Sequence, residues 1–152
     1  MKHLLVVFSS QTGRTAALIE AACAGAADWS DEVETRCQPA LAATLDDLLW
    51  ADGLIIGSPE NFGYLSGAVK DFLDRTYYPA EGKVDGLPYL MLVSAGNDGS
   101  GAVRALERIA AGYRWKRVAE PLIVRADPDD SARALARERG AMLAAGLALG
   151  TL

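Results

Sequence analysis

Residues that commonly build metal centres, disulfide frameworks and nucleophilic active sites are scarce in this sequence, which has two cysteines and one histidine. Cys23 and Cys37 stand too far apart for a CxxC redox or zinc motif, and we expect both to be small buried apolar residues. His3 opens an apolar run, where a structural or solvent-facing role is expected. The sequence therefore gives no indication of a side-chain nucleophile or a histidine base.

Long apolar runs and a surplus of positive charge are also absent. The apolar run Leu4–Phe8 is too short for the core of a signal peptide or for a membrane span, so we expect a cytoplasmic protein that does not enter a membrane. A formal net charge of -5 disfavours binding to nucleic acid. Hydrophobic and charged fractions of 51% and 23% over 152 residues are typical of one globular domain, and we expect no second one.

Two widespread phosphate-binding motifs are missing as well. The chain has no GxxxxGK[ST], which argues against a nucleoside triphosphatase. No GxGxxG follows a predicted strand, which argues against a dinucleotide-binding Rossmann site. The sequence also contains no internal repeat and no low-complexity tract.

Apolar runs of strand length alternate with longer segments of helical period, which is the pattern of parallel β-α-β units with helices on both faces of one sheet. Strands are predicted at His3–Phe8, Val33–Cys37, Gly53–Gly57, Tyr89–Ser94 and Val118–Val124. Helices are predicted at Thr15–Ala27, Leu45–Trp50, Gly67–Tyr77, Ala102–Ala111 and Asp129–Leu149. This succession predicts an α/β, three-layer doubly wound fold around a five-stranded parallel sheet of order 2-1-3-4-5.

In such sheets, ligands bind beyond the carboxyl ends of the strands, where the strand order reverses. The loops after the first, third and fourth strands are therefore expected on one rim. Elsewhere, Pro121 is predicted to interrupt the fifth strand, as at an edge strand or a bulge. The segment Pro79–Lys83 is predicted to be a mobile surface connection.

The first of these loops joins a strand to a helix through hydroxyl residues and one glycine. Backbone N–H groups at the start of a helix have no intrahelical partners, and the helix dipole adds positive charge there, so this turn can hold a phosphate. Gly13 allows a positive φ or a close approach of the ligand. The alternative is an ordinary helix start capped by serine or threonine. The residues concerned are Ser10, Gln11, Thr12, Gly13, Arg14 and Thr15.

The run SQTGRT, Ser10 to Thr15, resembles the phosphate loop S/T-x-T-G-x-T of the flavodoxin-like family. This resemblance implies that the chain binds flavin mononucleotide (FMN) through its ribityl phosphate, within the flavodoxin-like fold. Electron-carrying flavodoxins commonly have asparagine at the position of Arg14. Arg14 either strengthens phosphate binding or points into water.

The second loop, SPENFGYLSG, follows the third predicted strand and exposes aromatic residues where no hydrophobic period requires them. The longer run from Gly57 to Arg75 resembles the corresponding stretch of flavodoxin-like quinone reductases and NAD(P)H-dependent flavin reductases. That resemblance implies that the loop borders the flavin ring, with Pro59, Glu60, Asn61, Phe62, Gly63 and Tyr64 as candidate cofactor-binding residues. Alternatively, Phe62 and Tyr64 pin the loop to the core, and Glu60 is a solvated carboxylate.

On the helix that follows this loop, Ser66 is the expected N-cap. The apolar residues of that helix are expected on the sheet side, with Lys70, Asp71, Asp74 and Arg75 facing outward.

The third loop, SAGNDGSGA, is rich in glycine and lacks aromatic residues. The resemblance places the pyrimidine end of the flavin here, held by backbone donors of Ala95, Gly96 and Asn97; the candidate residues are Ser94, Ala95, Gly96, Asn97 and Gly99. A plain glycine-rich turn before a helix is the alternative. Flavodoxins that carry electrons usually stack a tyrosine of this loop on the ring, so its absence favours an open flavin face and hydride transfer. The alternative is that Tyr64 or an aromatic residue of a second subunit covers that face.

The resemblance implies an FMN-dependent oxidoreductase that takes electrons from NAD(P)H or a redox protein and passes hydride to a small acceptor such as a quinone. Two alternatives remain: a flavodoxin that carries single electrons between proteins, and a flavodoxin-like protein that has lost its flavin. A homo-oligomer is possible, with Tyr77, Tyr78 and Trp115 either on its surface or in the core.

The only dense basic region comprises Arg104, Arg108, Arg114, Lys116 and Arg117. We expect these residues to decorate the fourth helix and its C-terminal end, where the dipole favours cations. Attraction of NAD(P)H phosphates or of an acidic partner is the alternative interpretation.

Overall fold

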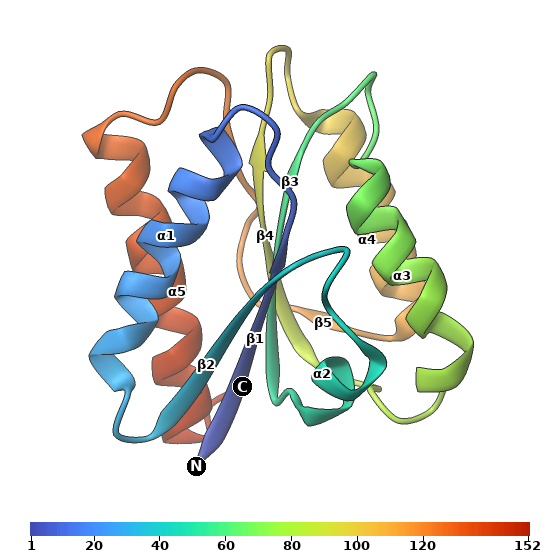
Figure 1. The fold of residues 1–152 in the computed structure, drawn as a ribbon. Helices are drawn as coiled ribbons and strands as arrows, with labels where there is room; N and C mark the ends of the chain where they lie inside the picture. The colour runs from blue at the N-terminus through green and yellow to red at the C-terminus, as the bar shows by residue number, and fades with distance from the viewer.

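The computed structural model describes residues 1–152, and it has a central sheet between two layers of helices (Figure 1). The strands are β1 (Lys2–Phe8), β2 (Val33–Pro39), β3 (Gly53–Pro59), β4 (Pro88–Ser94), β5 (Lys116–Arg117) and β6 (Leu122–Val124). The helices are α1 (Arg14–Ala26), α2 (Leu45–Trp50), α3 (Gly67–Ala80), α4 (Ser100–Tyr113) and α5 (Asp130–Leu149), with a short 3-10 helix at Ala27–Trp29. No helix combines the length and the apolar character that a membrane crossing requires.

All strand pairs are parallel, and the order β2-β1-β3-β4-β5 confirms the predicted topology. The predicted single fifth strand is wrong, because two short strands pair with β4 in succession: β5 beside its start and β6 beside its end. Pro121 lies in the gap between them, where its missing N–H would break the ladder. The expected interruption at Pro121 is thus confirmed as a complete break.

Side chains of the central strands alternate between two apolar cores, one on each face of the sheet. Along β1, Leu5 and Val7 pack into the core under α3 and α4, whereas Leu4 and Val6 pack into the core under α1 and α5. Side chains of a strand point to opposite faces in turn, so a strand buried on both sides reads as a continuous apolar run. The apolar runs of the sequence therefore correspond to central strands.

The two helical layers differ in how closely their helices approach. Helices α1 and α5 are in backbone contact: a Cβ on Gly25 would collide with the backbone of Arg137, and one on Gly140 with the backbone of Ala22. Helices α3 and α4 leave a groove of about 300 Å³, in which Tyr77 and Ile109 are among the lining residues. Figure 1 shows the first pair on the left of the sheet and the second on the right.

Helix α3 is longer than expected and continues through Pro79 to Ala80, so the predicted connection Pro79–Lys83 is wrong in its first half. Ala80 is fully buried in the core, which fixes the last turn of the helix. Trp115 also belongs to the core, where it stacks on Tyr113 with ring centroids 4.3 Å apart. Of the residues considered for an oligomer surface, Tyr78 is the most exposed.

The prediction that both cysteines are buried is wrong. Cys37 is exposed on the edge strand β2, and Cys23 on α1 is half-buried. The register pairs Cys37 with Val6, so its side chain points to the face that α1 covers. The two thiols interact there: the hydrogen bond between them raises the pKa of Cys23 and lowers the pKa of Cys37.

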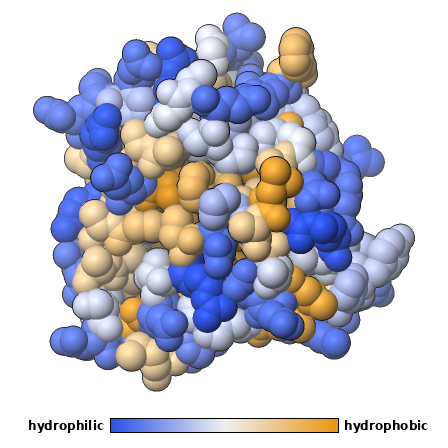
Figure 2. Space-filling view, in the orientation of Figure 1, coloured by the Kyte–Doolittle hydropathy of each residue, from blue (hydrophilic) through white to orange (hydrophobic).

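Figure 2 shows apolar residues gathered in the middle of one face of the molecule, surrounded by hydrophilic ones.

We expect Cys37 to react with iodoacetamide at neutral pH about tenfold faster than Cys23, because a lower pKa gives a larger thiolate fraction and the side chain is exposed. Peptide mapping by mass spectrometry over time measures both rates. In a Cys23→Ala variant, no donor is left beside the Cys37 thiolate, and Cys37 should react more slowly. Equal rates at the two cysteines would contradict the thiol pairing.

Candidate functional site

Three loops meet where the carboxyl ends of β1, β3 and β4 reach the upper edge of the sheet in Figure 1. They enclose a hollow of about 140 Å³. Ten residues line it: Gln11, Thr12, Arg14, Thr15, Pro59, Glu60, Asn61, Ser94, Ala95 and Gly96. All ten were predicted as cofactor-binding residues, and the parallel sheet brings them together from three distant parts of the chain.

The loop between β1 and α1 presents a row of free backbone donors. The N–H groups from Ser10 through Thr15 donate to no group of the chain, whereas Ala16 donates to the Ser10 hydroxyl at 3.1 Å. Gly13 is the N-cap of α1, with a φ of 92°, and it provides no side-chain cap. An ordinary capped helix start does not describe this turn, which has the form of an anion site.

Thr15 has a different role from its neighbours because its hydroxyl is already engaged. The side chain is buried, and its Oγ1 lies 2.6 Å from the Ser94 Oγ at the end of β4. This hydrogen bond joins the first loop to the third. Thr12 is exposed, and its hydroxyl has no partner in the chain, so it is the threonine hydroxyl available to a phosphate.

Arg14 lies at the hollow but is not a free cation. Its Nε donates to the carboxylate of Asp127 at 2.7 Å, and Asp127 lies in the loop between β6 and α5. The Asp127 side chain is largely exposed, so water weakens the pair. The ion pair orients the guanidinium beside the phosphate loop, which neither of the two sequence-based interpretations anticipated.

The second loop is a tight turn that lifts an aromatic side chain away from the molecule. Asn61 and Tyr64 form an isolated antiparallel bridge, with φ values of 51° at Phe62 and 73° at Gly63 between them. Positive φ at both central residues is the geometry of a type I′ turn. Phe62 is fully exposed and Tyr64 is exposed, so the idea that they pin the loop to the core is wrong.

Glu60 connects the second loop to the third. One carboxylate oxygen accepts the Gly99 N–H at 3.2 Å, and the other accepts the N–H groups of Gly101 at 2.9 Å and Ala102 at 3.2 Å. Glu60 therefore caps α4 from outside the helix, where a negative charge also suits the helix dipole. It is neither a solvated carboxylate nor a group free to approach a ligand with both oxygens.

The third loop keeps some backbone donors free and uses others. The Ala95 N–H donates to the Val124 carbonyl at 2.9 Å, so the prediction that it serves the flavin is wrong. The N–H groups of Gly96 and Asn97 donate to no group of the chain. Gly99 has a φ of 73° and its Cα faces Ile123, which leaves no room for a Cβ. The loop is therefore more than a plain turn before a helix.

A fourth segment of the rim was not predicted. A second hollow of about 370 Å³ shares Gln11 and Asn61 with the first, and Pro39–Leu41 forms part of its wall. Leu41 is exposed there. The sequence signal was available, because Ala40 and Leu41 directly follow Pro39, the last residue of β2, and so reach the same edge of the parallel sheet.

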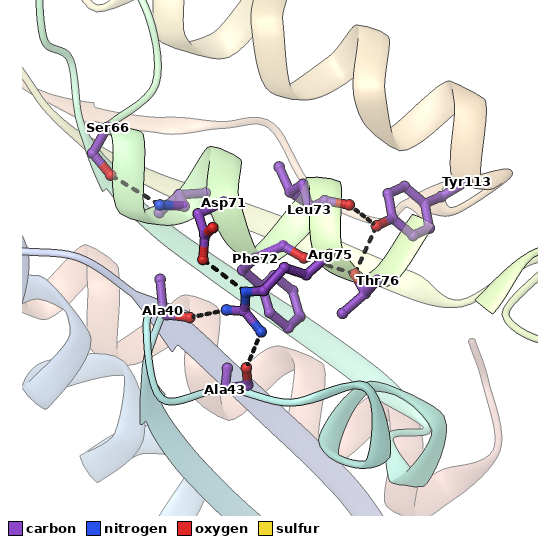
Figure 3. A network of polar contacts seen from close by, with 10 residues as sticks. Ala40, Ala43, Ser66, Asp71, Phe72, Leu73, Arg75, Thr76 and Tyr113 are labelled. Atoms are coloured by element: carbon purple, nitrogen blue, oxygen red, sulfur yellow. Dashed lines mark hydrogen bonds and ion pairs between the residues drawn. The ribbon is translucent and has the colours of Figure 1, made fainter. Parts of the chain in front are cut away.

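Arg75 fixes this fourth segment, although its sequence position predicted an outward-facing residue. Its two terminal nitrogens donate to the Ala43 carbonyl at 2.9 Å and the Ala40 carbonyl at 3.0 Å, while its Nε donates to Asp71 at 2.7 Å (Figure 3). Ser66 caps the same helix through the Val69 N–H, as predicted. Arg75 thus anchors the segment after β2 to α3.

Comparison with known proteins agrees with this geometry. Residues 6–125 match the model of the family described as NADPH-dependent FMN reductase. A flavodoxin of Aquifex aeolicus is 36% identical over 101 residues, covering 66% of this chain and 54% of its own. An NAD(P)H dehydrogenase (quinone) of Acidithiobacillus ferrooxidans is 34% identical over 95 residues, covering 50% of this chain and 48% of its own. The chain thus spans about half the length of these curated relatives.

Among solved structures, a flavodoxin from the domain Archaea superposes with a TM-score of 0.86 at 20% identity, covering 95% of this chain and 98% of that one. At this identity the superposition supports the fold alone. The family match covers most of the chain and confirms FMN as the predicted cofactor. The chain belongs to the NADPH-dependent FMN reductase family of flavodoxin-like, FMN-binding redox proteins.

Proposed function

We propose that this chain is an NAD(P)H-dependent oxidoreductase that passes hydride through bound FMN to a small acceptor such as a quinone. The observation that carries the proposal is the third loop, which has no aromatic side chain and leaves the N–H groups of Gly96 and Asn97 free. Such a loop can hold the edge of a flat ring without covering its face. The family description and the name of one relative support the same class of reaction.

The residues present fit FMN. The free N–H groups from Ser10 to Thr15 and the Thr12 hydroxyl would hold its phosphate, with the guanidinium of Arg14 beside them. The N–H groups of Gly96 and Asn97 would donate to carbonyl oxygens of the ring, and those of Phe62 and Gly63 are free on the opposite loop. When bound, FMN supplies the hydride chemistry, and the protein supplies position and electrostatics.

A second candidate is a carrier of single electrons between proteins. It is favoured by the fully exposed Phe62 ring on the turn beside the site, which offers an apolar contact to a partner protein. One of the relatives is also named a flavodoxin. A carrier needs no access for a nucleotide to the ring face, so the two functions differ in their response to NAD(P)H.

Anaerobic titration of the FMN-loaded protein tests the proposal. We expect one equivalent of NADPH or NADH to bleach the visible absorbance of the bound flavin, and a quinone added next to restore it. Free FMN at the same concentration is the control for nucleotide oxidation without the protein. Bleaching by dithionite but not by either nucleotide would overturn the reductase in favour of the carrier, and no FMN binding by calorimetry would overturn both.

A further inference from the structure

Helix α1 and the edge strand β2 bring the two cysteines of the chain together. Cys37 pairs with Val6 in the parallel register of β1 and β2, and Val6 belongs to the core under α1, so the Cys37 side chain points toward that helix. Cys23 follows Ile19 and precedes Ala26 on the sheet-facing side of α1, and it packs against the same core. The two side chains therefore approach each other from the strand and from the helix.

The two sulfur atoms are in contact, and both cysteines are free. The Cys23 thiol donates a hydrogen bond to the Cys37 sulfur, which lowers the pKa of Cys37 and raises the pKa of Cys23. Burial is the other cause that acts on the pKa of Cys37, and it acts in the opposite direction. The pair thus consists of an easily ionised thiol on the strand and a protonated thiol on the helix.

Solvent reaches the two sulfurs unequally. Strand β2 is the last strand on its side of the sheet, and Cys37 is exposed there, whereas Cys23 is half-buried under the helix. Thiolate character and exposure decide which cysteine an oxidant attacks, so Cys37 is the first to react. Cys23 then lies beside the oxidised sulfur, in the place of a resolving thiol.

We propose that Cys37 and Cys23 form a reversible disulfide within one chain when the protein meets a hydroperoxide, with Cys37 as the attacking sulfur and Cys23 as the resolving one. The inference does not depend on the proposed reductase function, because neither cysteine lines the two hollows at the upper edge of the sheet. A disulfide requires two side chains that point toward each other across a short gap, and the register of β1 and β2 provides this arrangement.

The reaction has two steps. In the first, the Cys37 thiolate attacks one oxygen of the hydroperoxide: an S–O bond forms, the O–O bond breaks, and the leaving oxygen takes a proton from water. Cys37 is oxidised to the sulfenic acid, and the hydroperoxide is reduced to an alcohol or to water. In the second step, the Cys23 sulfur attacks the Cys37 sulfur: the S–S bond forms, the S–O bond breaks, and the hydroxide leaves as water with the proton of Cys23.

Peroxide treatment of the FMN-loaded protein tests the site. The protein is reduced with dithiothreitol, freed of it, and exposed to equimolar hydrogen peroxide. We expect the intact mass to fall by two hydrogen atoms, a non-reducing peptide map to link the peptides of Cys23 and Cys37, and dithiothreitol to restore both thiols. A disulfide between two chains, a sulfinic acid on Cys37 beside a free Cys23 thiol, or two unreacted thiols would overturn the proposal.

Two matched variants test the roles of the cysteines, and circular dichroism verifies that both variants fold. In Cys23→Ala, the sulfenic acid on Cys37 has no partner, and we expect dimedone to trap it. In Cys37→Ala, we expect Cys23 to remain a thiol under the same exposure, because it is half-buried. Dimedone labelling of Cys23 as fast as that of Cys37 would overturn the assignment of the attacking sulfur.

Thermal unfolding of the parent protein gives a test that does not depend on the variants. A disulfide from Cys23 to Cys37 closes a loop of about 15 residues, and we expect the oxidised protein to melt about 5 °C above the reduced one, with FMN bound in both cases. An oxidised protein whose Tm is equal or lower would show that the bond forms only in a distorted chain, and would overturn the site. Failure of NAD(P)H to reduce the flavin would overturn the reductase function and leave this proposal standing.

Discussion

The dissociation constant of FMN is expected to rise about 100-fold in a Glu60→Ala variant, which corresponds to about 2.7 kcal/mol. Glu60 accepts three backbone N–H groups at the start of α4, at distances of 2.9 to 3.2 Å. Hydrogen bonds to a charged group contribute about 1.5 to 3 kcal/mol each, so their joint loss is large even after water replaces some of them.

We expect the loss to reach FMN because Glu60 sets the spacing of the two loops between which the flavin ring is proposed to bind. After the substitution, the bond from the Glu60 N–H to the Ser94 carbonyl at 2.8 Å remains, but the second loop no longer holds the start of α4. The free N–H groups of Gly96 and Asn97 would then lose their fixed distance from the Asn61–Tyr64 turn. A ligand that contacts both loops would then have to order them on binding, and this lowers its affinity.

Calorimetric titration with FMN measures this effect, with thermal unfolding followed by circular dichroism to verify that the variant folds. Glu60→Gln keeps an acceptor oxygen but loses the charge, and we expect an intermediate affinity. The control is Glu81→Ala, which removes an exposed carboxylate that makes no ion pair. An FMN affinity of Glu60→Ala within twofold of the parent protein would show that Glu60 does not position the loops.

The second large effect concerns stability: Gly140→Ala should lower the free energy of unfolding by about 3 kcal/mol. A Cβ at Gly140 would collide with the backbone carbonyl of Ala22 on α1. Backbone cannot yield by changing rotamer, so the two helices must separate. Their separation would loosen the apolar core in which Leu18, Leu143 and Leu147 pack against the sheet.

Urea denaturation of the parent protein and of Gly140→Ala gives the difference in their free energies of unfolding. Gly112→Ala is the matched control, because it is also a glycine within a helix, but the nearest atom to its Cβ is a Tyr77 carbon at 3.8 Å. Alanine has the higher helix propensity, so this control should be neutral or more stable by up to about 1 kcal/mol. If Gly140→Ala and Gly112→Ala have the same free energy of unfolding, the close approach of α1 and α5 does not require glycine at position 140.

Much of the fold could be predicted because its signals are local. The apolar runs of β1, β3 and β4 and the helical period of α1, α3 and α5 lie in contiguous residues, and a parallel sheet then places the loops after β1, β3 and β4 on one edge. The turn from Ser10 to Thr15 is equally local, since its hydroxyl residues and Gly13 fix its own backbone. The fifth strand was harder, because only pairing with β4 decides which residues around Pro121 count as strand.

By itself, then, the sequence determined the strands, the helices and the strand order, because steric preference and hydrophobic period act between near neighbours, and its resemblance to flavodoxin-like proteins indicated the FMN family. Only the tertiary structure decided the partners of the charged and polar side chains. Glu60 caps a helix some forty residues away, Arg14 finds Asp127, and Arg75 clamps the segment after β2. Such pairs depend on which surfaces the packed helices bring within about 3 Å of each other, and no local pattern in the chain contains that information.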